Sequence, residues 1–241
     1  MINAQLVLSP LIGKRLIAKA VLKSEHFRKA IEKGIVVLSL GTTNALIYEE
    51  ITGKKVSKEA YAAGIVKDTL TLSDKIKRLP ALVLNKGEAI DISWQEALIK
   101  MGEDSLFIKG ANAYDDLGLV GVLVGGEAGG TIGQALGTLV VKKIPLMVPI
   151  GLEKRVPSVR ESAILLSEPA TSTQNLDVGM VVVANGIIID EIKAFKILFD
   201  LDATLVAAGG IAGFEGSYVI NIKGTETIVN EALDLVNLLK D

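Results

Sequence analysis

Cysteine is absent from this chain of 241 residues, and histidine occurs once, at His26. A chain without cysteine has no disulfide, no thiolate nucleophile and no cysteine-rich zinc site. One imidazole is also too few for a histidine metal cluster. We therefore expect no metal site, and the sequence indicates no bound cofactor.

The chain has almost no excess of positive over negative charge, or the reverse, and it has few aromatic side chains. The formal net charge is −2, and 4% of the residues are aromatic. Binding to a phosphate backbone needs an excess of Lys and Arg, and binding to single strands needs aromatic rings that stack on bases. We expect no nucleic-acid partner.

We also expect neither a secretion signal nor a membrane span. Residues 1–19 lack the charged-then-apolar order of a signal peptide. Residues 119–141 are apolar, but Glu127, Gln134 and several glycines interrupt them. We expect a cytoplasmic, soluble protein without a membrane partner. With 49% hydrophobic residues, the chain can bury the core of one large α/β domain over residues 1–241.

Glycine, in contrast, is concentrated in the middle of the chain. Nine of the 28 residues between Gly110 and Gly137 are glycine. Each glycine in regular structure costs about 0.5–1 kcal/mol relative to alanine, so such a density indicates sharp turns, close packing or a backbone that approaches a ligand. The spacing of Thr131 and Gln134 matches a capping box and predicts a helix from Thr131 to residues 142–143.

The first half of the chain predicts helices, then a strand and a glycine turn. Residues 11–33 have helical spacing and form one or two helices, the second from about Ser24. Residues 35–40 form a buried strand, and residues 45–51 form a helix. Between them lie Gly41, Thr42, Thr43 and Asn44. This order is typical of a turn that binds an anion at a helix N-terminus, and equally of an ordinary strand–helix connection.

Two further strands are expected over residues 106–109 and 144–150, each followed by a glycine. Ligands of open parallel sheets lie outside the carboxyl ends of the strands. The turns that contain Gly41, Gly110 and Lys154 are therefore expected at one edge of an open, mostly parallel sheet with flanking helices.

Residues 53–92 differ in composition from the rest of the chain. The part up to Glu88 is rich in basic residues, and its polar and apolar residues alternate irregularly. We expect a small insertion or flap at the sheet edge. Ser93 and Glu96 match a capping box that opens a helix to about Met101.

The last third of the chain alternates between strands and helices. Asn185-Gly186 separates two apolar runs within residues 180–190 and predicts a hairpin. A helix over residues 191–199, strands over 203–208 and 218–222, and a helix from about Thr225 complete the expected order.

Several segments in this order resemble one superfamily. They are KRLIAKA…FRKAIEKGIVVLSLGTTNALIYEEI, IKGANAYDDLGLV, IPLMVPIGLEK and the weaker VVVANGIIID. These segments are similar to ribose-5-phosphate isomerase type A and its relatives, glucosamine-6-phosphate deaminase and the CoA transferases, and equally to the effector domain of DeoR-type sugar-responsive repressors. The resemblance covers somewhat under half of the chain. It implies the corresponding α/β fold, a sugar-phosphate ligand and a homo-oligomer.

The same comparison selects candidate site residues. Where the isomerase has Asp-Gly-Ala-Asp, this chain has Lys109, Gly110, Ala111 and Asn112, so both carboxylates are lost. Proton transfer between the carbon atoms of a sugar needs a positioned base. Among the remaining acids Asp115, Asp116 and Glu127, the candidate catalytic residues are Glu127 and Asp115.

The residues expected to contact the ligand lie in the three turns. They are Gly41, Thr42, Thr43, Asn44, Lys109, Gly110, Asn112 and Lys154. Lys154 stands where the resemblance places a lysine beside the phosphate.

Three functions remain open from the sequence. The first is an enzyme, isomerase-like or hydrolase-like, that acts on a small phosphorylated metabolite with a non-standard acid/base set. The second is a non-catalytic sugar-phosphate sensor related to the repressor effector domains. The third is a CoA transferase-like enzyme that uses Glu127 as its nucleophile. All three bind a small anionic metabolite.

Overall fold

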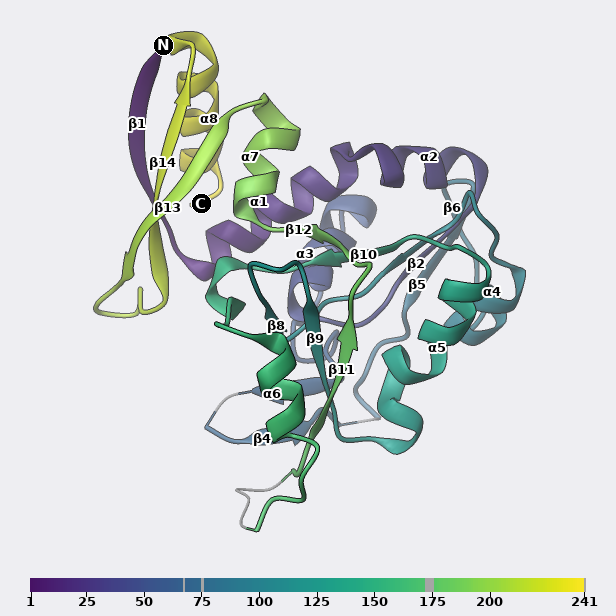
Figure 1. Cartoon of the computed structure of the whole chain (residues 1–241). Helices are drawn as coiled ribbons and strands as arrows, with labels where there is room; N and C mark the ends of the chain where they lie inside the picture. Colours follow the sequence, from purple (N-terminus) through teal and green to yellow (C-terminus); the bar gives the residue numbers. More distant parts are fainter. Residues whose placement is uncertain (67, 75, 172–175, 241) are drawn as a thin grey trace.

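The computed structural model describes residues 1–66, 68–74, 76–171 and 176–240. Figure 1 shows a central sheet with helices around it and a smaller lobe that holds the first strand and the last helix. Strands and helices alternate along most of the chain. The predicted α/β class is confirmed.

The central sheet has six strands in the order β12-β10-β7-β2-β5-β6. The four strands from β12 to β2 are parallel, whereas β5 and β6 are antiparallel additions at one edge. All residues of β2, β7 and β10 are buried, as their continuous apolar sequences predict. The strands are β2 (Ile35–Leu38), β5 (Leu82–Asn85), β6 (Glu88–Ala89), β7 (Leu106–Ile108), β10 (Leu146–Pro149) and β12 (Ile187–Ile189).

Seven helices accompany the strands of this region among the described residues. The predicted break near Ser24 is confirmed, because Ser24 ends the first helix and its hydroxyl accepts the N–H of Phe27 in the second. The capping box of Ser93 and Glu96 is also confirmed. The helices are α1 (Pro10–Lys23), α2 (Glu25–Lys33), α3 (Thr42–Thr52), α4 (Trp94–Lys100), α5 (Gly130–Val141), α6 (Val159–Leu165) and α7 (Glu191–Phe199).

The start of α5 differs from the prediction. The helix begins at Gly130, its N-cap is Gly129, and no side chain caps it, so the capping box predicted at Thr131 is wrong. A short 3₁₀ turn, η1 (Glu127–Gly129), precedes the helix. Ala128 and the two glycines after it have positive φ, and this left-handed backbone, rather than a side-chain cap, sets the entry into the helix.

A second, three-stranded sheet has the order β11-β9-β8. Its strands are β8 (Ala113–Tyr114), β9 (Val120–Val124) and β11 (Gly179–Val183). The hairpin predicted at Asn185-Gly186 is wrong. The strand before the turn, β11, pairs with β9, and the strand after it, β12, pairs with β10 of the central sheet. The two-residue hairpin turn favoured by Asn-Gly needs positive φ at both residues, and neither has it.

The smaller lobe contains the antiparallel sheet β1-β14-β13 and the last helix. The strand β1 was not predicted, because its seven residues show only a weak alternation before they pair along the whole of β14. Buried side chains of this lobe belong to the same contiguous apolar cluster as those of the central sheet. The elements are β1 (Ile2–Leu8), β13 (Asp202–Gly209), β14 (Ser217–Gly224) and α8 (Glu226–Leu238).

The segment 53–92, expected as an insertion or flap, divides into two parts. The strands β3 (Gly64–Val66) and β4 (Leu70–Leu72) form a separate two-stranded sheet. The strands β5 and β6 extend the central sheet. Two of the basic residues of this segment, Lys67 and Lys75, lie outside the described residues. Within the part of the chain that is described, no helix has both the length and the apolar character needed to cross a bilayer.

Candidate functional site

Three strand-end turns meet at the carboxyl edge of the parallel strands. The Ser39 N–H donates to the Ile108 carbonyl at 3.0 Å, which joins the ends of β2 and β7. The Lys109 N–H donates to the Met147 carbonyl at 3.0 Å, which joins β7 to β10. The Lys154 ammonium donates to the Ala111 carbonyl at 2.8 Å, which joins the turn after β10 to the turn after β7. The turns of Gly41, Gly110 and Lys154 are therefore connected, and we call them together the rim.

The first rim turn is the N-terminus of α3. Gly41 is the N-cap residue, and no side chain caps this helix. Its own N–H donates to the Tyr61 carbonyl at 2.7 Å. The N–H groups of Thr42, Thr43 and Asn44 find no hydrogen-bond acceptor among the described residues. These three N–H groups at the positive end of an 11-residue helix have no intrahelical acceptor, and of the three residues Thr42 is the one exposed to an anion.

Thr43 and Asn44 lie in the first turn of α3 but are buried. The Asn44 amide donates to the carbonyls of Ser39 at 2.8 Å and Ile108 at 3.4 Å, so it fixes α3 against the ends of β2 and β7. The hydroxyl oxygen of Thr43 and the amide oxygen of Asn44 are buried without a hydrogen-bond partner among the described residues. Of the four predicted residues of this turn, Gly41 and Thr42 are accessible at the rim.

Lys109 and Lys154 form the cationic centre of the rim. Both side chains are half-buried. The amine of Lys109 has one hydrogen bond, to the Gly110 carbonyl at 3.3 Å. Neither amine forms an ion pair with a carboxylate of the described residues. Burial, followed by the positive charge of Lys154, lowers the pKa of Lys109 to about 8. Burial, followed by the charge of Lys14, also lowers the pKa of Lys154.

The space above this pair is open at Gly110. A Cβ atom placed on Gly110 would meet no heavy atom within 4 Å. The residue is therefore not required to be glycine by packing against the described parts of the chain. The open space at Gly110, whose carbonyl accepts from the Lys109 amine, leaves room for a ligand beside that amine.

A buried carboxylate supports the turn that carries Lys154. Glu191, the first residue of α7, is fully buried. Its Oε2 accepts the N–H of Leu152 at 2.9 Å, and its Oε1 accepts the hydroxyl of Tyr218 at 2.5 Å. Burial is the main reason why the pKa of Glu191 is raised to about 7.

Glu191 and its neighbour Asp190 were not predicted as functional residues. In the sequence, the two acids precede a helix, where acids commonly cap the first turn. Asp190 does so, because its side chain accepts the N–H of Lys193 at 2.8 Å. It also accepts the hydroxyl of Tyr114 at 3.3 Å. Burial of Glu191 depends on contacts with distant parts of the chain, which no local sequence pattern indicates.

Lys14 brings a third cation to the same side of the rim. Its amine pairs with Glu153 at 3.1 Å, and both side chains are about one-fifth exposed, at 20% and 19%. Unlike Lys109 and Lys154, Lys14 is therefore neutralised by a carboxylate. Lys154 has no ion pair but feels the negative charges of Glu153 and Glu191, whereas Lys109 has no such acid beside it among the described residues.

Two of the predicted site residues have structural partners. The side-chain oxygen of Asn112 accepts the Leu123 N–H at 3.1 Å, which ties the connection after β7 to β9. The carboxylate of Asp115 is 3% exposed and accepts three backbone N–H groups, those of Leu117, Leu119 and Val159, at 2.9–3.1 Å. These bonds occupy both side chains in holding loops together.

Glu127 is not linked to the rim by any hydrogen bond or ion pair among the described residues. It is exposed in the turn η1, and its side chain makes no hydrogen bond or ion pair with the described residues. The rim contacts described above involve neither η1 nor the residues beside it. Glu127 therefore has no contact that would connect it to the two amines.

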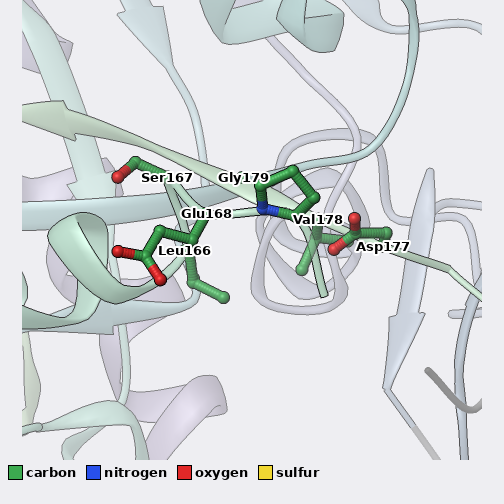
Figure 2. Close-up of a pocket in the computed structure, with 7 residues that line it drawn as sticks. Leu166, Ser167, Glu168, Asp177, Val178 and Gly179 are labelled. Atoms are coloured by element: carbon green, nitrogen blue, oxygen red, sulfur yellow. The ribbon is translucent and has the colours of Figure 1, made fainter. Parts of the chain in front are cut away.

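Two surface depressions of the described structure lie elsewhere than at the rim residues. One, drawn in Figure 2, is lined by Leu166, Ser167, Glu168, Pro169, Asp177, Val178 and Gly179. A second lies among α1, α3, α7 and α8 beside Lys19 and Phe199. Neither contains a rim residue.

The described residues contain no cluster of three or more His, Asp or Glu side chains that could hold a metal ion. Comparisons of the chain with protein-family models, with curated proteins and with solved structures found no match. The geometry and charges of the rim are therefore the observations that indicate a function for this protein.

Proposed function

We propose that this protein binds a small phosphorylated metabolite at the rim. The observation that carries the proposal is the pair of half-buried amines, Lys109 and Lys154, without a carboxylate partner among the described residues. Two like charges that are partly removed from water repel one another. A bound anion would relieve this repulsion, whereas a neutral ligand would not.

The N-terminus of α3 supports the same ligand. Its first-turn N–H groups are unpaired in the described structure, and Asn44 hydrogen-bonds to the carbonyl of Ile108, the residue before Lys109. A phosphate has three terminal oxygens and up to two negative charges, so it can accept from backbone N–H groups and from an ammonium together. We assign the phosphate to the α3 N-terminus and Lys154, with Lys109 beside it.

The resemblance to sugar-phosphate proteins favours a phosphorylated sugar within this class. The open space at Gly110 provides room for the uncharged part of such a ligand. The carboxylates of the candidate acids are less available to a ligand than the two amines are. Asp115 and Glu191 are engaged in hydrogen bonds, and Glu127 has no hydrogen bond or ion pair with either amine. This arrangement favours binding without carboxylate catalysis, as in the sensor function, over an isomerase or transferase that uses these acids.

The proposal is tested by isothermal titration calorimetry and thermal unfolding with ribose 5-phosphate, inorganic phosphate and unphosphorylated ribose. Ribose 5-phosphate should bind, and at 100 times its Kd it should raise the free energy of unfolding by about 2.7 kcal/mol. Ribose should have no effect at the same concentration. Phosphate alone should compete with the sugar phosphate.

Variants of the rim locate the site. Lys154→Ala should weaken binding of ribose 5-phosphate by at least about tenfold, because a charge-assisted hydrogen bond contributes about 1.5–3 kcal/mol. Lys100→Ala, which removes an exposed lysine at the end of α4, should leave the affinity unchanged. Equal stabilisation by ribose, or equal affinities of the Lys154→Ala protein and the unaltered protein, would contradict the proposal.

A further inference from the structure

Lys109 is the nucleophile that the rim offers. The nearby acids Asp115 and Glu191 accept hydrogen bonds with both carboxylate oxygens. The amine of Lys109 has a single, long hydrogen bond, to the Gly110 carbonyl at 3.3 Å. An ammonium has three donors, so most of its hydrogen-bonding capacity is unused by the described residues.

The backbone holds this lysine in a fixed place. It directly follows β7, which lies between β2 and β10 in the central sheet. Its N–H donates to the Met147 carbonyl at 3.0 Å. Functional groups supported by central strands are held more exactly than groups on free loops. The side chain is half-buried, and Gly110 beside it leaves open space for a second molecule.

The surroundings of Lys109 favour a neutral amine. The neighbouring cation, Lys154, is anchored to the Ala111 carbonyl at 2.8 Å. Burial and this neighbour place the pKa of Lys109 at about 8. About a tenth of such amines are neutral at pH 7, against about three in ten thousand for a lysine at its usual value. Desolvation beside a second cation is a known way to activate a lysine for covalent chemistry.

We propose that Lys109 forms an imine with the carbonyl carbon of a phosphorylated aldehyde or ketone. The inference rests on the proposed phosphate site, which would bring the carbonyl group toward the amine while Lys154 and the α3 N-terminus hold the phosphate. It assigns a covalent step to Lys109, whereas the acids Asp115 and Glu191 already accept hydrogen bonds from other parts of the protein. The ligand class is narrowed to phosphorylated carbonyl compounds, which include open-chain sugar phosphates.

The step balances without another reactant. The lone pair of the Lys109 nitrogen attacks the carbonyl carbon, and the electron pair of the C=O π bond moves to oxygen, which takes a proton to give a carbinolamine. The C–O bond then breaks, a C=N bond forms, and one water molecule leaves. Both hydrogens of that water come from the amine, so nothing is oxidised or reduced.

Borohydride trapping tests the inference on the intact protein. Glycolaldehyde phosphate, a short phosphorylated aldehyde that cannot form a ring, is incubated with the protein at pH 7, and sodium borohydride then reduces any imine to a stable secondary amine. Peptide mass spectrometry measures the modified fraction at each lysine. Lys109 should be labelled at least about tenfold faster than the exposed Lys100. Equal labelling of the two lysines overturns the inference.

Two variants connect the reactivity to the geometry. Lys109→Met should lose the fast-labelled site, whereas Lys100→Met should retain it. Lys154→Met should shift the pH of half-maximal labelling of Lys109 upward, because the neighbouring positive charge is gone. Fast labelling of Lys109 with an unchanged pH midpoint in Lys154→Met would contradict the assigned role of Lys154. The comparison of Lys109 with Lys100 in the unaltered protein does not depend on how well the variants fold.

Unphosphorylated glycolaldehyde separates this inference from the proposed function. Faster labelling of Lys109 by the phosphorylated aldehyde supports both. Selective labelling of Lys109 at the same rate by both aldehydes supports the imine and contradicts the phosphate site. Tight binding of ribose 5-phosphate without a selective adduct at Lys109 supports the phosphate site and overturns the imine. In that last case the amine is protonated by its contact with the phosphate.

Discussion

The Tyr218 hydroxyl donates a 2.5 Å hydrogen bond to Glu191 Oε1. The two residues come from different parts of the fold, Tyr218 from β14 of the smaller lobe and Glu191 from the first turn of α7. The other oxygen of Glu191 accepts the N–H of Leu152, two residues before Lys154. One carboxylate therefore joins the smaller lobe to the rim.

Tyr218→Phe should destabilise the protein. The substitution removes the hydroxyl and leaves one oxygen of a fully buried carboxylate without its donor. An unsatisfied buried group of this kind costs about 1–3 kcal/mol. Urea unfolding at pH 7.5 measures the loss. Tyr48→Phe is the control, because the Tyr48 hydroxyl has no hydrogen bond among the described residues, and its effect should stay within about 0.5 kcal/mol. Similar losses in both variants would contradict the role given to Tyr218.

Gly13→Ala should also destabilise the protein, although alanine normally favours a helix. A Cβ atom on Gly13 of α1 would overlap Glu191 Oε1 and the Tyr218 hydroxyl oxygen. Overpacking of a close-packed interior costs about 1–3 kcal/mol. Gly137→Ala in α5 is the matched control, because a Cβ atom there meets nothing within 4 Å. It should stabilise the protein by about 0.5–1 kcal/mol. Thermal unfolding of the two variants should therefore give shifts of opposite sign.

Local sequence signals predicted much of the fold correctly. The break at Ser24, the capping box at Ser93 and the buried strands β2, β7 and β10 all depend on residues close together in the chain. The connection of the Gly41, Gly110 and Lys154 turns followed from the carboxyl-edge rule for parallel strands. In these cases the deciding interactions lie within a few residues or follow from strand direction.

Predictions failed where distant contacts decide the structure. Asn185-Gly186 has the residues of a hairpin turn, but β9 and β10 offer the two flanking strands separate partners. Glu191 reads as an ordinary first-turn acid of a helix, and its burial depends on Tyr218 and on Gly13, 178 positions earlier in the sequence. Asp115 was selected as an acid near the site, but its place in the fold depends on Val159, the first residue of the distant helix α6. These contacting residues are too far apart in the sequence to form part of any local pattern.

Stability should fall as the pH rises from about 4.5 to 7. Burial raises the pKa of Glu191 from its ordinary 4.5 to about 7, so in this range the folded protein retains a proton that the unfolded chain has lost. The stabilising effect of that proton is fully present below pH 4.5 and is lost as the pH passes 7. The change amounts to about 3 kcal/mol.

Urea unfolding at several pH values between 4.5 and 7.5 measures this dependence. Glu191→Gln should remove this part of the slope, because glutamine does not titrate. Glu231→Gln, at an exposed position of α8, should keep the slope of the unaltered protein. Parallel pH profiles for the Glu191→Gln and the unaltered proteins would contradict the prediction. They would show that Glu191 has the same pKa in the folded and in the unfolded protein.

Two adjacent acids, Asp115 and Asp116, should respond very differently to substitution. The Asp115 carboxylate accepts the N–H groups of Leu117 and Leu119 in its own loop, and that of Val159, the first residue of α6. Asp115→Asn keeps the size of the side chain but replaces one acceptor by an amide donor, so at least one backbone N–H loses its partner. Hydrogen bonds to a charged group contribute about 1.5–3 kcal/mol each, so we expect a loss of about 3 kcal/mol.

Asp116→Asn should cost less than about 1 kcal/mol, because its side chain is 73% exposed and its ion pair with Arg155 is at the surface. Urea unfolding compares the two variants, and amide hydrogen exchange at Val159 tests the cause. Exchange at Val159 should accelerate in Asp115→Asn and remain unchanged in Asp116→Asn. If Asp115 were instead a catalytic acid held free for a substrate, its substitution would leave both the unfolding free energy and the Val159 exchange rate unaltered. The three short hydrogen bonds to this carboxylate lead us to expect the opposite.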